Sequence, residues 1–595
     1  MSLNTLSDIF FAVVERGHDC VMMDRRAIQW IPISSQEFYR NVTGVARALE
    51  RWGVSKGDRV AILSENRPEW TITDFASQLL GAVVVPIYST LTGEQTAHIL
   101  RDSDPRIIAV STEKQLHKVL SIQNQTGVEN VLVMDHVETA HAVDLQQLMR
   151  EGPTERDPQL DARARSIRPD DLATIIYTSG TTGPSKGAML THGNIASNIS
   201  YSLQGFGMDL GQISISFLPL SHITARHVDL AMLYHGVTLA YCSFIDDLPR
   251  ALLEVRPTVF VAVPRVYEKI HARTEQKAKR FPLSAIYRWA VAIGRTHKSE
   301  ILAGKRPRSL PWNLADRLVY SQVRAGLGGR IEIFISGGAP LGRELAEWFA
   351  TIGVRIHEGY GLTETSPVIA VNTPQAHKVG TVGKSLPNVE VRTADDGEVL
   401  VRGPSVFQGY WNRPEETANA FVDGWFKTGD IGALDADGFL SITDRKKDLI
   451  KTSGGKFIAP QPIENSLRLN ALIGTAVVVG DRRKFPAVII SPYFPVLDDW
   501  ARANNVAFSS RQELINNAKV QGLYEGIVAD ANQNLARFEK LKRVLLVADE
   551  FSPENGALTP TLKLRRRVVE DRYHRLIEEM YAQAEASGVD LRVHP

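Results

Sequence analysis

Residues 178–187 read Thr-Ser-Gly-Thr-Thr-Gly-Pro-Ser-Lys-Gly and follow directly on the apolar run Leu172–Tyr177. Glycines allow a tight turn and a close approach to a ligand, and hydroxyl and backbone N–H groups can donate to a phosphate. In a Walker loop the lysine directly follows the last glycine. Here Pro184 and Ser185 stand between Gly183 and Lys186, so this is not a Walker loop. Taken alone, a Gly-rich loop of this kind could also be a solvent-exposed turn that binds no phosphate. The candidate phosphate ligands are Thr178, Ser179, Gly180, Thr181, Thr182, Gly183 and Lys186.

Short apolar runs alternate with amphipathic stretches on both sides of this loop, from residue 36 to about 375. Arg59–Leu63 and Val259–Val263 are examples of the runs, and Glu37–Trp52 is an amphipathic stretch. The alternation predicts parallel β-α-β units with ligand sites at the carboxyl ends of the strands. The stretch after Gly187 is expected to be helical. Beyond Val382, short strands between Gly, Pro and Asp turns predict a small β subdomain.

A dense charge run, Asp444–Asp448, suggests a domain boundary, although such runs are usually solvated turns. The residues that follow alternate strands with helices and are numerous enough for a separate small domain. The predicted fold is therefore α/β: a large N-terminal domain of α/β subdomains plus a small β subdomain, and a smaller mobile α+β C-terminal domain. The expected bounds are 1–443 for the first domain, 444–448 for the hinge and 449–595 for the C-terminal lid.

Size and composition exclude several classes of protein. A chain of 595 residues is too long for one core, and 44% hydrophobic with 23% charged residues is typical of soluble globular proteins. The net charge of +1 offers no argument for a nucleic-acid partner. Only Cys20 and Cys242 occur, which suits a cytoplasmic protein without a disulfide framework. No secretory signal or apolar run of about 20 residues is seen, so no transmembrane segment is expected. Peripheral contact with a membrane and the oligomeric state stay open.

Seven further motifs follow the loop in order along the chain. They are Phe217–His222, Val263–Lys269, Ser336–Leu341, Gly359–Thr365, Trp425–Asp430, Asp444–Asp448 and Thr559–Lys563. Together with the loop they resemble the adenylate-forming superfamily, which includes acyl-CoA synthetases, luciferases and peptide-synthetase adenylation domains. The segment around Arg265, the run Ile458-Ala459-Pro460 and the overall length most resemble the long-chain fatty acyl-CoA synthetases.

The resemblance implies a two-step ligase. A fatty acid would first attack the α-phosphate of ATP, giving acyl-AMP and pyrophosphate, and coenzyme A would then displace AMP. Negative charge accumulates on a crowded phosphoryl centre in the first step, so positioning and electrostatics are expected to dominate catalysis. The cofactors implied are ATP, Mg²⁺ and coenzyme A as a co-substrate.

The resemblance also assigns the nucleotide site. Glu364 matches the magnesium-binding glutamate of the family and Thr363 its α-phosphate contact, although a Glu after a Thr cap is commonly only a helix terminus. Asp430 would accept from both ribose hydroxyls, and Arg445 matches the second ribose contact. The remaining candidates for nucleotide binding are Tyr360 and Gly361 together with the small residues Gly338, Ala339 and Pro340.

Lys563 matches the lysine that bridges the substrate carboxylate and the α-phosphate in the family. The common Gly-Lys form is absent, because Leu562 stands in place of the glycine. For the second step, Gly454 and Gly455 are expected to approach the pantetheine arm of coenzyme A. Some relatives carry a lysine just before these glycines, but here the residue is Ser453, so no catalytic lysine is expected in this loop.

His222 matches the family histidine beside the acyl and thiol passages, although a lone His after Pro-Leu-Ser is more often structural. Long-chain relatives often read His-x-x-Glu-Arg at this point. Here Ala225 replaces the glutamate, which leaves the acyl specificity open.

Three alternatives remain beside a long-chain fatty acid–CoA ligase. The first two share the fold: an acyl-AMP ligase that loads a carrier protein, and a CoA ligase for an aryl or alicyclic acid. The compact run Lys447–Pro460 shows no insertion after the hinge, which favours coenzyme A as the acceptor. The third is a noncatalytic protein that binds fatty acid or nucleotide. The presence of Lys186, Glu364 and Lys563 argues against it.

Overall fold

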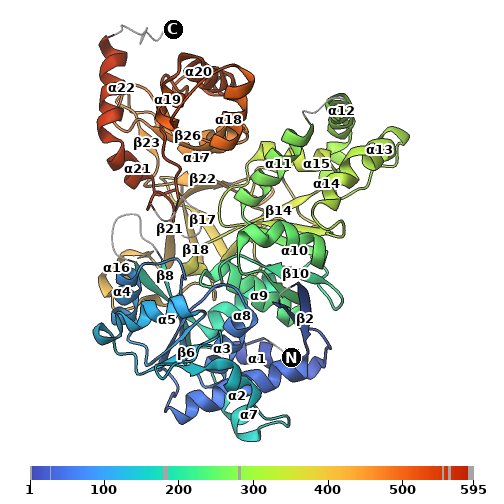
Figure 1. Cartoon of the computed structure of the whole chain (residues 1–595), viewed down its shortest axis with the longest axis vertical. Helices are drawn as coiled ribbons and strands as arrows, with labels where there is room; N and C mark the ends of the chain where they lie inside the picture. Colours follow the sequence, from blue (N-terminus) through green and yellow to red (C-terminus); the bar gives the residue numbers. More distant parts are fainter. Residues whose placement is uncertain are drawn as a thin grey trace.

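The computed structural model describes residues 3–26, 28–178, 185–278, 283–552, 555–559 and 564–586. Two large sheets and a small β subdomain occupy the N-terminal three quarters of the chain, and a smaller unit stands above them (Figure 1). The predicted α/β architecture with a smaller α+β C-terminal part is confirmed. Within these described ranges, no helix has the length and apolar character needed to cross a membrane.

The first large sheet has nine strands. Six consecutive strands, from β14 to β1, run parallel, as the alternating pattern predicts, whereas the strands at both ends of the sheet pair antiparallel. In spatial order the strands are β16 (Lys384–Ser385), β15 (Val368–Val371), β14 (Ile356–Gly361), β13 (Ile333–Ser336), β12 (Val259–Ala262), β10 (Ile213–Ser216), β11 (Thr238–Tyr241), β1 (Met22–Arg26) and β2 (Gln29–Ile33).

The second large sheet has eight strands and carries the predicted phosphate loop between β8 and β9. In spatial order they are β19 (Gly409–Tyr410), β9 (Lys186–Thr191), β8 (Leu172–Thr178), β4 (Val83–Ile87), β3 (Arg59–Leu63), β5 (Ile107–Val110), β6 (Asn130–Val133) and β7 (Val143–Asp144). The expectation of a helix directly after Gly187 was wrong. Residues 186–191 pair antiparallel with β8, and α8 (His192–Ser202) begins only at the Thr191 cap, because alternate β9 side chains pack into the core.

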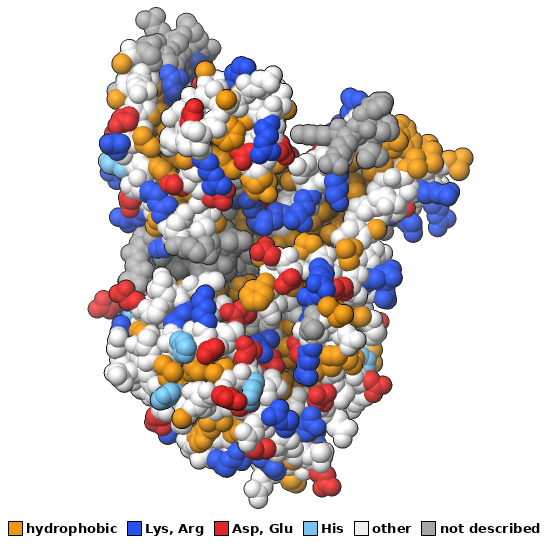
Figure 2. All heavy atoms as spheres, in the orientation of Figure 1, with side chains coloured by type: hydrophobic (Ala, Val, Ile, Leu, Met, Phe, Trp, Pro, Cys, Tyr) orange, Lys and Arg blue, Asp and Glu red, His pale blue; other side chains and the backbone are white. Residues whose placement is uncertain are grey.

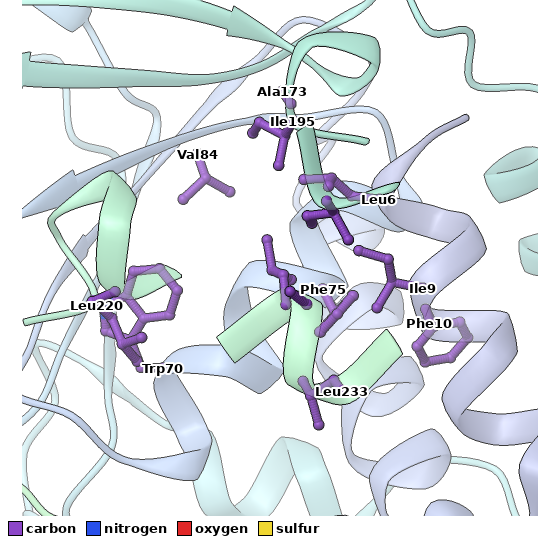
Figure 3. Packing of buried hydrophobic residues seen from close by; sticks show 14 of the residues in the cluster. Leu6, Ile9, Phe10, Trp70, Phe75, Val84, Ala173, Ile195, Leu220 and Leu233 are labelled. Carbon is purple, nitrogen blue, oxygen red and sulfur yellow. The ribbon is translucent and has the colours of Figure 1, made fainter. Parts of the chain in front are cut away.

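Strand residues alternate between two cores on each large sheet, which explains the layered arrangement. In β3, Val60 and Ile62 face the main core and Ala61 and Leu63 face a second one. The main core lies between the sheets, where Phe10, Trp70 and Phe75 pack with strand residues such as Val84 (Figure 3). The helices that contribute to it are α1 (Leu6–Arg16), α2 (Ser35–Arg51), α3 (Pro68–Leu79), α8 and α9 (Ile223–His235).

The outer faces of the two sheets are covered by separate helices. The nine-stranded sheet is covered by α10 (Leu248–Val255), α11 (Pro264–Ala278), α12 (Leu283–Leu302) and α15 (Arg343–Thr351). The eight-stranded sheet is covered by α4 (Gly93–Ser103) and α5 (Glu113–Leu120). The short helices α6 (Leu145–Arg150) and α7 (Pro158–Arg165) add side chains to the main core.

The predicted small β subdomain is a five-stranded antiparallel sheet. Its strands are β17 (Glu390–Thr393), β18 (Glu398–Arg402), β20 (Phe421–Val422), β21 (Trp425–Leu434) and β22 (Leu440–Arg445), with α16 (Pro414–Asn419) beside them. Val399, Val401 and Phe426 join the main core, so this sheet is anchored to the large domain. Asp444 and Arg445, from the charge run, form the end of β22.

The C-terminal unit is built on a three-stranded sheet of β25 (Ile473–Val479), β26 (Ala487–Pro492) and β27 (Val544–Leu546). Alternate residues face two cores, Ala476 and Val478 toward one and Val477 and Val479 toward the other. The remaining elements are the pair β23 (Ile450–Lys451) and β24 (Phe457–Ile458), and the helices α17 (Pro460–Arg468), α18 (Phe494–Ala503), α19 (Arg511–Asn516), α20 (Ala518–Asn532), α21 (Arg566–Arg572) and α22 (His574–Ala586).

Candidate functional site

Three predicted site residues meet where β14 comes close to the β21–β22 hairpin. Asp430 and Arg445 lie directly opposite each other in the ladder, and the Arg445 Nε atom is 3.0 Å from Asp430 Oδ1. The other carboxylate oxygen, Oδ2, accepts a hydrogen bond of 2.7 Å from the Tyr360 hydroxyl. The Asp430 side chain is only 5% exposed, against 42% for Arg445. Two strands from the β subdomain and one from the large sheet therefore hold a carboxylate, a phenol and a guanidinium together.

Glu364 lies just after β14, in the short 3-10 turn Thr363–Thr365. Its Oε1 atom accepts a hydrogen bond of 2.8 Å from the hydroxyl of Tyr410, and its backbone carbonyl accepts one from the N–H of Phe407. Thr363 is buried next to it. The chain from Phe407 to Tyr410 thus fixes both the backbone and the side chain of the predicted magnesium ligand. Tyr410 was not among the residues predicted from the sequence, where a tyrosine 46 residues from Glu364 carries no signal.

Gly361 separates Tyr360 from the Glu364 turn and leaves no room for a side chain. A Cβ atom at this position would lie 1.8 Å from the carbonyl oxygen of Pro367. The N–H of Leu362 donates to that same carbonyl, which closes the turn against β15. The close approach of the two backbones requires glycine here and sets how far Tyr360 lies from Glu364.

The two ends of the predicted phosphate loop lie beside these residues. Thr178 ends β8 and pairs with Lys186 at the start of β9. The Lys186 Nζ atom is 5.6 Å from the centre of the Tyr410 ring and 3.7 Å from Glu416 Oε1. The predicted ligands Ser179, Gly180, Thr181, Thr182 and Gly183 lie outside the described residues.

An open cavity of about 440 Å³ adjoins the cluster. Lys186 and Tyr410 form part of its wall, and Thr428 and Gly429, the two residues before Asp430, form another part. The cavity therefore borders the cluster, and its charged lining is mixed: Lys186 and Lys427 face it together with Glu398 and Glu416, which suits a polar ligand.

Gly338, Ala339 and Pro340 follow the carboxyl end of β13, the strand next to β14. Gly338 has a φ of +82°, a conformation that glycine adopts without strain. The Pro340 carbonyl accepts a 3.4 Å hydrogen bond from Asn465 in α17 of the C-terminal unit. The adjacent Glu358 is buried and its carboxylate accepts from the N–H of Leu341; burial raises the pKa of Glu358 to about 7.

Electrostatics keep the hydroxyls of the site as donors and Arg445 charged. Burial, reinforced by Asp430, holds the pKa of Tyr360 well above its usual value, and burial with Glu364 does the same for Tyr410. Burial opposes the charge of Arg445, but Asp430, Tyr360 and Glu364 hold its pKa above the ordinary range. Burial, followed by the neighbouring Arg445, lowers the pKa of Lys447. The site therefore keeps neutral phenols beside a charged guanidinium.

The hydrogen bonds described for other predicted residues are with groups outside this cluster. The Nδ1 atom of His222 accepts from the N–H of Thr224 at the start of α9, so this histidine is a helix cap. Gly454 and Gly455 lie in an exposed turn whose hydrogen bonds join C-terminal residues: Ser453 to Arg483, and Gly455 to Thr452. Lys563 lies outside the described residues, between Leu558 and Leu564, which form a β-bridge.

A metal at this site would have few protein ligands. Across the ranges that the structure describes, no group of three or more His, Cys, Asp or Glu residues could hold a metal ion. A single carboxylate such as Glu364 suits Mg²⁺, which keeps several waters and binds mainly to phosphate oxygens in nucleotide sites. The donor set therefore fits a magnesium ion carried in with a nucleotide.

Most of the chain matches two known protein families. The AMP-binding enzyme family matches residues 16–411, and its C-terminal domain family matches residues 447–585. The long-chain-fatty-acid–CoA ligase FadD15 of Mycobacterium bovis is 37% identical over 564 residues, which cover 93% of this chain and 92% of that protein. The human long-chain-fatty-acid–CoA ligase ACSBG1 is 30% identical, with coverage of 97% and 85%.

Solved structures share the fold at low sequence identity. The A-PCP didomain of the carboxylic acid reductase from Segniliparus rugosus, in complex with AMP, superposes with a TM-score of 0.76 at 21% identity, covering 98% of this chain and 83% of that one. The anthranilate CoA ligase AuaEII in complex with anthranoyl-AMP gives 0.73 at 18% identity, with coverage of 98% and 99%.

Proposed function

Because this chain belongs to the family of AMP-binding enzymes, we propose that it is an AMP-forming ligase that joins a long-chain fatty acid to coenzyme A. The observation that carries the proposal is the likeness to long-chain fatty acid–CoA ligases over nearly the whole chain, including both domains. The cluster of Tyr360, Asp430 and Arg445 supports nucleotide binding by this chain.

Asp430 is proposed to accept hydrogen bonds from the ribose hydroxyls of ATP. Its carboxylate is already oriented on one side by Tyr360 and on the other by Arg445, so little side-chain freedom remains to be lost on binding. Arg445 can donate to the ribose as well, because 42% of its side chain stays exposed beside Asp430. Gly338, Ala339 and Pro340 are proposed to contact the adenine, with Tyr360 and Gly361 on its other side.

In the first step a carboxylate oxygen of the acid attacks the α-phosphorus of ATP. The new O–P bond forms as the bond from the α-phosphorus to the bridging oxygen breaks, and the electron pair leaves with pyrophosphate. Lys186 and the loop from Thr178 are proposed to hold the leaving phosphates, and Lys563 to hold the attacking carboxylate against the α-phosphate. Fixed positive charge at a phosphoryl centre stabilises the transition state.

Glu364 and Thr363 are proposed to act at the phosphate end. A bound magnesium ion would neutralise part of the phosphate charge. Glu364 would hold the ion by one carboxylate oxygen while Tyr410 fixes the carboxylate by donating to Oε1. Thr363 would donate its hydroxyl to the α-phosphate.

In the second step the thiol of coenzyme A gives its proton to water, and the thiolate attacks the acyl carbon. The C–S bond forms, and the bond from the acyl carbon to the phosphate oxygen breaks, releasing AMP. We propose that residues 449–595 move as a lid about a hinge at 444–448 relative to residues 1–443. This movement would bring Gly454 and Gly455 to the site, with His222 beside the passages for acyl chain and thiol.

With only two cysteines, the chain suits a reducing cytoplasm.

The experiment is an assay of pyrophosphate and AMP release with Mg-ATP and acetate, octanoate, palmitate, oleate or benzoate, each with and without coenzyme A. Palmitate- or oleate-dependent turnover that requires coenzyme A is expected. It should collapse in Lys563→Ala and persist in the control Lys519→Ala, an exposed lysine on α20. Pyrophosphate exchange without a thioester would instead indicate an acyl-AMP ligase that loads a carrier. Preference for benzoate would indicate an aryl acid ligase, and no acid-dependent release would contradict a catalytic function.

A further inference from the structure

The lobe formed by α12, α13 (Leu310–Ala315), a π-helical turn (Asp316–Tyr320) and α14 (Ser321–Ala325) is strongly basic. Residues 283–330 contain nine Lys and Arg residues but only two acids, whereas the whole chain has a net charge of +1. Both acids are locally paired: Glu300 Oε1 lies 2.7 Å from His297 Nδ1, and Asp316 Oδ1 lies 2.5 Å from Arg324 Nη2. The charge of this lobe is therefore positive and concentrated.

One face of the α13 segment is used for packing. Trp312 and Tyr320 are 2% and 0% exposed, and the Tyr320 hydroxyl donates to the carbonyl of Ala290 in α12. The ring of Trp312 also packs edge-on against His297 of α12. These contacts fix the orientation of the segment on α12, so the opposite face must point outward.

The outward face is apolar. Leu310, Leu314 and Leu318 are 85%, 51% and 49% exposed, and each follows the last by four residues, close to one helical turn. On α12, Ile286 and Trp289 are a further 39% and 38% exposed. Large aliphatic side chains gathered on an exposed surface mark an interaction site, in contrast to the scattered apolar residues of ordinary surfaces.

Basic side chains lie along the same stretch of chain. The Arg306 side chain is 83% exposed, and Lys305, Arg308 and Arg317 are exposed as well. Hydrophobic and basic side chains are adjacent on the lobe at the upper right of Figure 2, where Figure 1 places α12 to α14. Long Lys and Arg side chains can keep their charge at a polar boundary while neighbouring apolar groups enter a less polar layer.

We propose that this lobe docks on the surface of an anionic lipid bilayer. Leu310, Leu314 and Leu318 would enter the boundary between headgroups and acyl chains, and Lys305, Arg306, Arg308 and Arg317 would contact lipid phosphates. A helix that lies in a membrane interface combines an apolar stripe with Lys and Arg in this way. Polybasic segments are attracted to anionic leaflets.

Charge complementarity favours a lipid surface over a second copy of the chain. Self-association through the leucine stripe would bring two lobes with the same positive excess together, and like charges at an interface disfavour binding. An anionic bilayer offers both the opposite charge and an apolar layer beneath it. The docking does not depend on the proposed ligase activity, because no residue of this surface belongs to the nucleotide site.

The test is sedimentation of the full-length protein with vesicles of phosphatidylcholine alone, or containing about 25% phosphatidylglycerol, at low and high salt. We expect binding to the anionic vesicles that weakens as salt rises. Replacing all three leucines by serine (Leu310→Ser, Leu314→Ser, Leu318→Ser) should weaken binding at least about tenfold. A variant that combines Arg306→Gln, Arg308→Gln and Arg317→Gln should lose most of the salt-dependent part of the binding to anionic vesicles.

Matched controls separate the lobe from general effects. Leu210→Ser, Leu253→Ser and Leu434→Ser change leucines that are 52%, 56% and 40% exposed elsewhere. Arg482→Gln, Arg502→Gln and Arg575→Gln remove the same charge from side chains that are 92%, 71% and 86% exposed. Both controls should bind anionic vesicles as the parent protein does, and circular dichroism should show that all variants are folded.

Two results would overturn the proposal. One is binding that the lobe variants and their controls reduce equally, or that none of them reduces. The other is that the parent protein does not bind vesicles at all. If light scattering then shows self-association of the parent protein that the leucine variant abolishes, the stripe is an interface between copies of the chain. Neither result bears on catalysis, which is measured separately with octanoate in the absence of vesicles.

Discussion

The hydroxyl of Tyr410 donates a 2.8 Å hydrogen bond to Glu364 Oε1, joining the last strand of the eight-stranded sheet to the turn after β14 of the other large sheet. The two residues therefore couple the two sheets at the phosphate end of the site. Glu364 is the proposed magnesium ligand, so its carboxylate must be oriented before a metal nucleotide binds. Tyr410 supplies that orientation through a group that stays protonated, since burial and Glu364 raise its pKa.

Tyr410→Phe is expected to raise the concentration of Mg-ATP needed for half-maximal pyrophosphate release by roughly tenfold. A hydrogen bond to a charged group is worth about 1.5–3 kcal/mol, and each 1.4 kcal/mol is a factor of ten. Steady-state kinetics at varied Mg²⁺ measures this, with Tyr493→Phe, a 48% exposed tyrosine, as the control. An unchanged dependence on Mg-ATP would show that Tyr410 does not position Glu364.

Gly454→Ala is expected to affect only the second step. A Cβ atom there would meet nothing closer than Thr452 Oγ1 at 4.0 Å, so the fold should tolerate it. If the backbone approaches coenzyme A, thioester formation should fall by about tenfold, or about 1.4 kcal/mol in the barrier. The exchange of pyrophosphate with ATP should not change.

The control for Gly454→Ala is Gly522→Ala, which also has open space around it but lies on α20. It should leave both steps unchanged. Equal loss of exchange and thioester formation in Gly454→Ala would contradict a role for this loop in the second step alone.

Asp74→Asn is expected to destabilise the N-terminal domain by about 3–5 kcal/mol, because it leaves a buried arginine without its counter-charge. Asp74 and Arg226 form a two-point ion pair with side chains only 2% and 1% exposed. Urea unfolding followed by tryptophan fluorescence measures the change.

The exposed pair Arg402–Glu390 provides the comparison for Asp74→Asn. Its side chains are 52% and 60% exposed, so Glu390→Gln should change the free energy of unfolding far less than Asp74→Asn does. Equal small effects of both substitutions would mean that the interior around Arg226 readily admits water.

Asp229→Asn is expected to alter how stability depends on pH. Burial raises the pKa of Asp229 to about 7, against 3.8 ordinarily, and Ser216 Oγ donates to its Oδ2 atom at 2.6 Å. Between pH about 4 and 7 the unfolded chain loses this proton and the folded protein keeps it. Stability therefore falls as pH rises through this window and levels off above it, by about 1.4 kcal/mol for each unit of pKa difference.

Asparagine cannot ionise but can still accept from Ser216. The free energy of unfolding of Asp229→Asn, minus that of the parent protein, should therefore increase from pH 4 to 7. Parallel urea titrations at several pH values measure it, and the difference cancels the contribution of other buried acids such as Glu358. A difference that does not vary with pH would mean that Asp229 is ionised in the folded protein throughout.

Local patterns in the sequence predicted most of the fold. The strands around Val60, Val259 and Val478 follow from apolar runs between turns, and the small β subdomain follows from its Gly and Asp turns. The exception is β9 after the phosphate loop, where the sequence Lys186–Thr191 does not distinguish a strand from a helix start. Its strand form depends on pairing with β8 on one side and β19 on the other, which are long-range contacts.

The candidate site was predictable only as separate motifs. Tyr360, Glu364, Asp430 and Arg445 each belong to a motif, and the tertiary structure shows that Tyr360, Asp430 and Arg445 meet. Tyr410 could not be found, because its contact with Glu364 depends on how β19 joins the second sheet. His222 follows its motif in sequence, yet its described contact is that of a helix cap.

The sequence by itself determined most of the order of strands and helices, the family motifs and the positive charge of residues 283–330, because these depend on residue type and on neighbours along the chain. Tertiary structure decided which groups share a site, as with Tyr410 and Glu364, and which face of α13 is buried. The apolar residues of α13 occur on both faces, so only the packing of Trp312 and Tyr320 against α12 leaves Leu310, Leu314 and Leu318 exposed. Burial depends on partners distant in sequence, and periodicity alone cannot specify them.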